Sequence, residues 1–206
     1  DSMGLIACER RDTVSPSIPS AETFRLFDHP YALAFASYMV GLATLLLWML
    51  AARLRIRRWI LDGDPVLDSR VLDAFRGAAF RNGLLHEYPV IEHPDIPAPL
   101  TCRIVRPMIM LPRGFASGLT EGELRAVAQH ETAHILRRDT LVFTLVAFVR
   151  TLFFFQPLVW YASRRISHHA EIICDSAALA YGNDPASYAE LLTRIAFRLP
   201  EHSLSE

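Results

Sequence analysis

Hydrophobic residues follow several distinct patterns along the chain. The stretch from Tyr31 to Ala52 holds 22 residues without a charge, which is long enough for a helix that spans about 30 Å of hydrocarbon. A second apolar stretch, Leu141 to Ser163, is interrupted by Arg150 and by Gln156-Pro157. Elsewhere, apolar positions recur at the spacing of amphipathic helices and short strands. These patterns predict a membrane-anchored protein that also carries a folded domain.

The folded part is predicted to be mainly α-helical with a small β element, an α+β fold. Asp64-Pro65 is expected to start a helix that ends at Asn82-Gly83. Its apolar side is predicted to hold Val66, Leu67, Val71, Leu72 and Phe75. Tyr88 to Glu92 and Cys102 to Leu111 are expected to form short strands, and His86 and His93 are expected to be surface residues rather than metal ligands.

Composition and charge narrow the choice of function. Hydrophobic residues make up 51% of the chain and its mean hydropathy is +0.21, which exceeds ordinary soluble usage. The net charge is −1, all 21 basic side chains are arginine, and no basic aromatic stripe is present, so direct nucleic-acid binding is not expected. The three cysteines, Cys8, Cys102 and Cys174, are scattered and odd in number, which suits reduced thiols.

The most informative motif is His130-Glu131-Thr132-Ala133-His134. Thr120 and Glu123 predict a capping box at the start of its helix, so that His130 and His134 project from the same face. Two such imidazoles can hold one zinc, which lowers the pKa of a water towards about 7, while Glu131 takes the proton of that water. The alternative is a pair of histidines packed on a helix without a metal.

A zinc site of this type needs a third protein ligand. The candidates downstream are His168, His169, Glu171 and Asp175. Glu171 and Asp175 are four residues apart on an apolar helix and therefore share a face. Glu171 as a ligand, with Asp175 accepting a hydrogen bond from a ligand imidazole, would give both acids a partner. Alternatively, they pair with Arg164, with Arg165 or with solvent.

A metal site shared by His130, His134 and Glu171 constrains the path of the apolar stretch at 141–163, because it requires these residues to lie on the same side of the membrane. A single crossing of the bilayer there would put Glu171 on the opposite side from His130. If Asp139 instead caps a new helix and Gln156-Pro157 makes a turn, two arms of about 15 and 14 residues, each roughly 21 to 23 Å long, return Glu171 to the level of His134. This hairpin is either a core element or one that dips into the membrane, and the aromatic residues near its tip favour lipid contact.

Several motifs in order resemble the BlaR/MecR-type integral-membrane zinc metallopeptidases. The likeness covers roughly Val66 to Leu199. Its motifs are residues 106–112, Leu119-Thr120 with Glu123-Leu124, residues 130–139, residues 153–161, residues 171–175, and Asp184-Pro185 with Tyr188-Ala189.

The resemblance implies a gluzincin-like zinc metalloendopeptidase. It implies His130, His134 and Glu171 as zinc ligands and Glu131 as general base, and Asp139 and Asp175 also match family positions. The implied partner is a cytoplasmic regulatory protein, such as a transcriptional repressor. The alternatives are a membrane signalling scaffold that keeps zinc but cleaves nothing, and an assembly subunit without a metal.

The expected organisation places the zinc domain at the cytoplasmic face of a bacterial inner membrane. Residues 1–29 form an extracytoplasmic segment, 30–52 a transmembrane helix, 53–63 a basic cytoplasmic linker, and 64–206 the metallopeptidase domain with the hairpin 141–163. The arginines at positions 53, 55, 57 and 58 set this orientation. A buried helix of a soluble protein is the alternative to the span. Because the best-known members of the family continue into a β-lactam sensor domain, we expect either a fragment of a longer receptor or a shorter relative.

Overall fold

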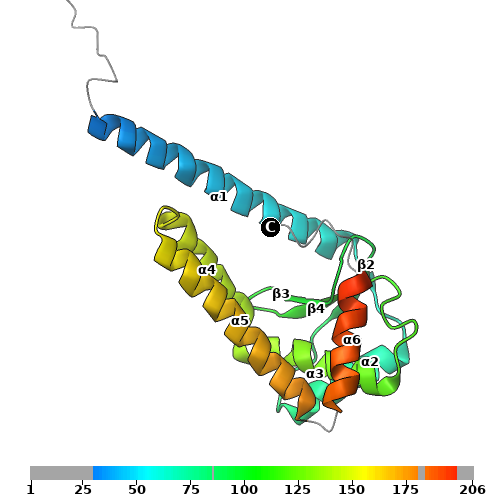
Figure 1. Ribbon diagram of the computed structural model, residues 1–206. Helices are drawn as coiled ribbons and strands as arrows, with labels where there is room; N and C mark the ends of the chain where they lie inside the picture. Colours follow the sequence, from blue (N-terminus) through cyan, green and yellow to red (C-terminus); the bar gives the residue numbers. More distant parts are fainter. Residues whose placement is uncertain (1–29, 85, 181–183, 199–206) are drawn as a thin grey trace, which may run out of the picture. The chain divides into compact units, whose positions relative to one another are not determined.

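The computed structural model describes residues 30–84, 86–180 and 184–198 (Figure 1). By its contacts the chain divides into two units, Asp1–Met39 and Val40–Glu206. Within the described residues, the first unit holds only the start of helix α1 (Pro30–Asp62), and the description below concerns the second. The described chain is mainly helical with one small sheet, as predicted.

Four short strands form the sheet in the order β1-β2-β4-β3. The strands β2 and β4 run parallel, whereas β1 pairs with β2 and β3 pairs with β4 in the antiparallel sense. In β4, Ile109 and Leu111 belong to one hydrophobic cluster, and Met108 and Met110 belong to another. This alternation places β4 between two apolar layers. The strand order leaves β3 at an edge of the sheet. The bounds are β1 (Asp64–Pro65), β2 (Val90–His93), β3 (Leu100–Cys102) and β4 (Met108–Pro112).

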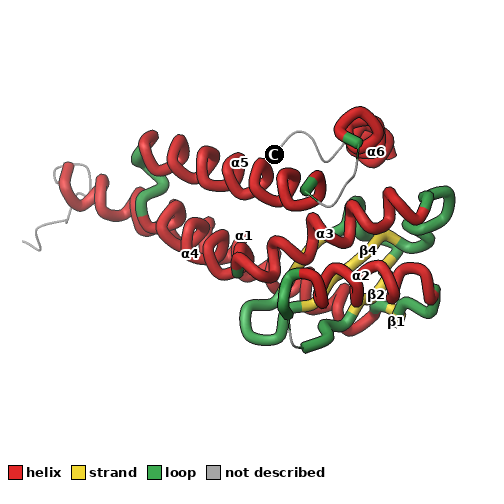
Figure 2. Tube along the Cα trace, turned by 90° about the horizontal axis from the view of Figure 1, so that it is seen from below, coloured by secondary structure: helices red, strands yellow, loops and turns green. Residues whose placement is uncertain are grey.

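The larger core forms where helices α2 (Ser69–Arg81) and α3 (Glu121–Arg137) pack on the sheet, as Figure 2 shows. Phe75 of α2, Ile109 of β4 and Leu124 of α3 are almost fully buried in it. Their burial holds α3 against the sheet, so the helix that carries the His-Glu-x-x-His motif is fixed by the hydrophobic core.

The second hydrophobic cluster joins the sheet to the end of α1. Ile56, Trp59 and Ile60 of α1 pack against the cluster that contains Met108 and Met110. Residues 53–62, predicted to lie in a basic linker, therefore continue the helix α1 and contact the folded domain. By length and composition, α1 is suited to crossing a membrane.

Within the described residues, three further helices follow α3, namely α4 (Asp139–Leu152), α5 (Pro157–Leu179) and α6 (Pro185–Arg198). Arg138, with φ of 58°, ends α3 and turns the chain directly into α4. Residues 153–156 connect α4 to α5, which begins with Pro157 in its first turn, a position that needs no backbone donor. The helix α5 packs along α4 and then along α3, so the chain returns to the motif helix.

The predicted start of α2 is wrong. Asp64-Pro65 forms the strand β1 beside β2, and the helix begins only at Ser69, because the Asp68 carboxylate accepts a hydrogen bond from the Arg70 backbone N–H and so caps it. Leu67, expected on the apolar side, is exposed. The predicted end at Asn82-Gly83 is confirmed, with Gly83 at φ of 70°.

Two further predictions in the sheet region are corrected. The strand expected from Cys102 to Leu111 is two strands, β3 and β4, because the chain turns between them and Arg103 adopts a φ of 66°. His93, expected at the surface, is buried, with its ring centroid 6.0 Å from that of Trp59 and its Nδ1 accepting from the Asp95 backbone N–H. His86 is exposed, as expected.

Candidate metal centre

The helix α3 presents the two motif histidines side by side. The predicted capping box is present, with Thr120 and Glu123 bonding reciprocally at the first turn. One helical turn separates His130 from His134, and their Nε2 atoms lie 3.3 Å apart. Both side chains are mostly buried. The pair therefore converges through Nε2, the atom that each imidazole has free for a further partner.

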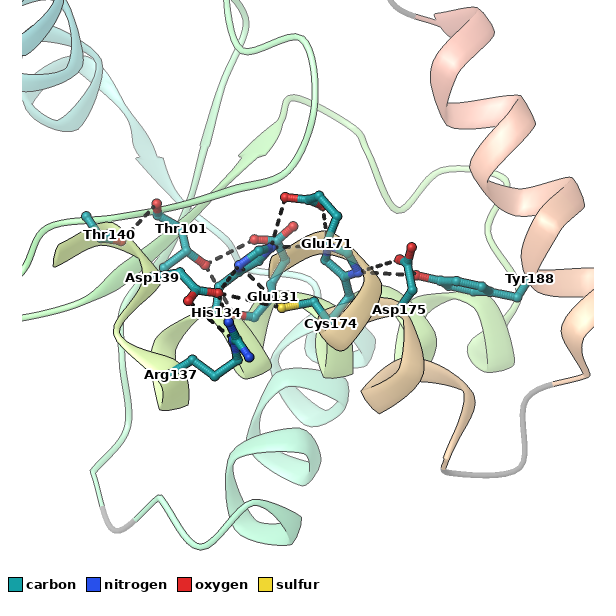
Figure 3. A network of polar contacts seen from close by, with 11 residues as sticks. Thr101, Glu131, His134, Arg137, Asp139, Thr140, Glu171, Cys174, Asp175 and Tyr188 are labelled. Carbon is teal, nitrogen blue, oxygen red and sulfur yellow. Dashed lines mark hydrogen bonds and ion pairs between the residues drawn. The ribbon is translucent and has the colours of Figure 1, made fainter. Parts of the chain in front are cut away.

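Glu171 of α5 completes a cluster of three metal-type donors (Figure 3). Its Oε2 lies 3.5 Å from His130 Nε2, and its Oε1 lies 3.9 Å from His134 Nε2. The donor atoms of the three residues all lie within 4.8 Å of one another. Because the Glu171 side chain is 52% exposed, the cluster is open to solvent on that side.

Each histidine has a carboxylate on its other ring nitrogen. Asp139 Oδ2 lies 2.9 Å from His134 Nδ1, and Asp175 Oδ1 lies 3.0 Å from His130 Nδ1. Such contacts fix the ring orientation and hold a proton on Nδ1, so that Nε2 keeps a free lone pair. Asp139 is the first residue of α4 but does not cap it, because its side chain points back to α3.

Asp139 is itself held by Arg137 and by Cys174. The Arg137 Nε donates to Asp139 Oδ2 at 3.1 Å. Cys174 Sγ lies 3.8 Å from the same oxygen and 3.4 Å from His134 Nδ1. Burial, followed by the negative charge of Asp139, raises the pKa of the Cys174 thiol to about 12. The thiol therefore stays protonated near neutral pH and can donate to Asp139.

Glu131 is buried beside the cluster, and one of its carboxylate oxygens accepts a hydrogen bond. The Thr101 hydroxyl, on the edge strand β3, donates to Glu131 Oε2 at 3.0 Å. Burial raises the pKa of the Glu131 carboxyl, and the nearby His130 and His134 together with the Thr101 hydroxyl only partly offset this. A carboxylate with a raised pKa is a better proton acceptor near neutral pH than an exposed glutamate.

The cluster is also electrostatically coupled. Burial alone would lower the pKa of His130, but its hydrogen bond to Glu171 and the charges of Glu131 and Asp175 raise it above the usual value. The same hydrogen bond lowers the pKa of Glu171. The site therefore attracts positive charge, whether a proton or a cation.

The structure brings all six site residues named from the sequence into one network, and their roles remain predictions. They are His130, Glu131, His134, Asp139, Glu171 and Asp175. Among the other candidates, His168 and His169 are exposed. Neither belongs to a group of possible metal donors among the described residues, the two groups being His130, His134 and Glu171 in one and His134, Asp139 and Cys174 in the other. Asp175 contacts His130, and neither Arg164 nor Arg165 forms an ion pair with it among the described residues.

Sequence reasoning missed the roles of Thr101, Tyr188, Cys174 and Arg137. Tyr188 stood in a motif of the family resemblance, but nothing in the spacing linked it to His130, 58 residues away. Thr101 lies one residue before the predicted strand at Cys102, and it reaches Glu131 only because β3 lies beside α3. Only Arg137 carried a local signal, since it stands two residues before Asp139.

Comparison with known proteins agrees with this geometry. A family model described as BlaR1 peptidase M56 matches residues 7–205. The chain belongs to this family. It is also similar to the regulatory protein BlaR1 of Bacillus licheniformis, with 30% identity over 145 residues. The likeness to BlaR/MecR-type peptidases is thus confirmed.

Coverage of the BlaR1 relative is partial. The alignment takes in 70% of this chain and 24% of that protein, so the chain corresponds to about a quarter of the relative's length. The M56 family is a family of metallopeptidases. The donor set found here, two imidazole nitrogens and a carboxylate, fits a catalytic metal ion. Both imidazoles are oriented by a carboxylate at Nδ1.

Proposed function

We propose that this M56 chain is a membrane-bound zinc metallopeptidase that hydrolyses peptide bonds of a cytoplasmic regulatory protein. His130, His134 and Glu171 hold the zinc, and Glu131 is the general base. The observation that carries the proposal is the convergence of two Nε2 atoms and one carboxylate beside a buried glutamate. Two imidazoles and a glutamate form one of the ligand sets of catalytic zinc.

The chemistry divides between the metal and the chain. Zinc, when bound, lowers the pKa of water and polarises a peptide carbonyl. Glu131 takes a proton from the attacking water on its Oε1, because Oε2 is occupied by the Thr101 hydroxyl. It then passes the proton to the nitrogen of the departing amine. Asp139 and Asp175 keep the two imidazoles oriented throughout.

The edge strand β3 supports recognition of an extended substrate. No strand pairs with its outer side in the described sheet, and Thr101 in its middle touches Glu131. A substrate segment added to this edge would lie along the motif helix, held by main-chain hydrogen bonds. The Thr140 hydroxyl, 3.5 Å from the Thr101 carbonyl oxygen, is the group that such a segment would displace.

The proposed membrane arrangement has α1 crossing the bilayer, with residues 1–29 outside and the zinc domain in the cytoplasm. The support is the charge-free stretch of α1 followed by four arginines. A transcriptional repressor as substrate follows from the resemblance to BlaR/MecR-type proteins, and it is proposed on that ground alone.

The connected helices α4 and α5 are proposed to enter the cytoplasmic leaflet of the bilayer that α1 crosses. Near the connection between them they expose large apolar side chains, among them Phe153, Phe155, Leu158 and Tyr161. A methyl group on Gly41 would come within 2.6 Å of the Phe154 ring, and Gly41 precedes the first arginine after the span by 12 residues, or about 18 Å of helix. This contact supports a tip at mid-span depth.

The charge of Arg150 within this segment has a compensating contact. Arg150 is the only charged residue between Asp139 and Arg164, and a charge at membrane depth is costly. Its guanidinium lies 4.9 Å from the centroid of the Trp160 ring, a cation–π contact that offsets part of this cost.

The test compares the wild-type chain with Glu131→Gln, which keeps the shape of the side chain but removes the base. Both proteins are purified in detergent and incubated with a bacterial cytoplasmic extract, and new peptide termini are counted by mass spectrometry. We expect Glu131→Gln to keep its zinc and to lose at least about 100-fold in cleavage rate. Equal numbers of new termini from both proteins would contradict the proposal and favour a non-catalytic zinc scaffold.

A further inference from the structure

Tyr188 of α6 reaches the candidate metal centre from a helix that supplies none of its ligands (Figure 3). Its ring is buried in the main hydrophobic core, with 6% of the residue exposed. Its hydroxyl donates to Asp175 Oδ1 at 2.8 Å and lies 3.2 Å from His130 Nδ1. The described part of α6 thus touches both the core and the site.

One carboxylate oxygen is shared by the two groups. Asp175 Oδ1 lies 3.0 Å from His130 Nδ1 and also accepts from the Tyr188 hydroxyl. The Asp175 side chain is 36% exposed, so without the phenol it can turn towards water. The phenol therefore keeps the acceptor of His130 in place, and with it the direction of Nε2.

The other histidine has a parallel arrangement. His134 Nδ1 lies 2.9 Å from Asp139 Oδ2, which accepts from Arg137 Nε. Each imidazole thus contacts a carboxylate through Nδ1, and each carboxylate accepts a hydrogen bond from a further side chain. The two donors differ in origin, because Arg137 belongs to α3 itself whereas Tyr188 belongs to α6. Burial, followed by Asp175, raises the pKa of the Tyr188 phenol well above its usual value, so it remains a donor at neutral pH.

We propose that Tyr188 is a positioning residue that couples the docking of α6 to the metal affinity of the centre, through Asp175 and His130. This inference rests on the proposed zinc site. Coupling of this kind is reciprocal. A docked α6 therefore strengthens zinc binding, and bound zinc in turn stabilises the docking of α6.

The first test measures the zinc affinity of the full chain by competition with a chromophoric chelator. Tyr188→Phe removes only the hydroxyl, and we expect it to weaken zinc binding by about 10- to 100-fold, as for other groups that orient a ligand. The matched control is Tyr88→Phe, which removes the hydroxyl of a partly buried tyrosine that is bonded to α3 through Thr132. Tyr88→Phe should leave zinc affinity unchanged.

A double variant identifies the route of the effect. If Tyr188 acts through Asp175, Tyr188→Phe combined with Asp175→Asn should bind zinc no more weakly than Asp175→Asn alone. Losses that multiply in the double variant, or a Tyr188→Phe protein with wild-type zinc affinity, would overturn the inference. Wild-type protein that binds no zinc would overturn the zinc site itself, which is a different failure.

A measurement on the wild type alone covers the case in which Tyr188→Phe does not fold. Amide hydrogen exchange is followed with zinc and after its removal by a chelator. Zinc should slow exchange in the core-facing part of α6, although α6 carries no ligand. Exchange in α6 that is the same in both states, while α3 responds to zinc, would equally overturn the coupling.

Discussion

The two motif histidines lie among four carboxylates, and this setting determines how they respond to pH. His130 contacts Glu171 and Asp175, and His134 contacts Asp139, while Glu131 is buried between them. Glu171, Glu131 and Asp175 raise the pKa of His130 despite its burial. An imidazole must lose its proton from Nε2 to bind zinc, so protons and zinc compete for the same atom.

Zinc affinity should therefore fall steeply on mild acidification. As the pH drops through the raised pKa of His130, the protonated fraction grows and the affinity should decrease by up to about tenfold per pH unit for each imidazole protonated. The fall should begin above the pH of about 6.5 expected for an isolated imidazole. Chelator competition between about pH 8 and pH 5.5 measures this, and an affinity independent of pH over that range would contradict these ligands.

Helical spacing within α3 was the most direct part of the site to predict from sequence, whereas Glu171, Asp175 and Asp139 were named from a second apolar stretch and from the family resemblance. The helical repeat alone brings His130 and His134 together with Glu131 between them. Thr101 and Tyr188 could not be predicted in this way, since each reaches the site by packing of a separate element against α3 or α5. Such contacts depend on tertiary structure, and no regular spacing of residues in the sequence signals them.

The bounds of helices and strands were likewise predictable where they depend on local signals, and not where they depend on distant segments. The start of α3 was predictable because a capping box is a local signal, and the end of α2 because Gly83 takes a left-handed conformation. The start of α2 was not, because Asp64-Pro65 also suits a helix start but pairs with β2 instead. Pairing between distant segments overrode the local preference there.

The helix α1 illustrates a different limit. Its apolar stretch predicted a span over residues 30–52, and the arginines suggested a basic linker over residues 53–63. The helix instead runs on to Asp62, where Ile56, Trp59 and Ile60 pack against the sheet. Three apolar positions among arginines were too few to signal this packing, which attaches the end of α1 to the folded domain.

For the molecule as a whole, the proposed topology makes all parts of the metal centre cytoplasmic. Reporters fused after Arg58, after Arg138 and after Asp175 should all report the cytoplasm, and one fused before Pro30 should report the outside. The reason is that α4 and α5 return the chain to α3, so His134 and Glu171 share one site. Reports of opposite sides from the Arg138 and Asp175 fusions would make residues 141–163 a full span and exclude the three-residue site.

The most direct test of the metal centre is the zinc content of the purified chain, measured by mass spectrometry against protein concentration. We expect one zinc per wild-type chain, and little or none in His130→Ala, His134→Ala or Glu171→Ala, because each removes one of three protein ligands. Circular dichroism controls for loss of the fold in the variants. Wild-type protein that takes up no zinc, or folded variants that all retain it in full, would contradict the assignment of His130, His134 and Glu171 as the zinc ligands.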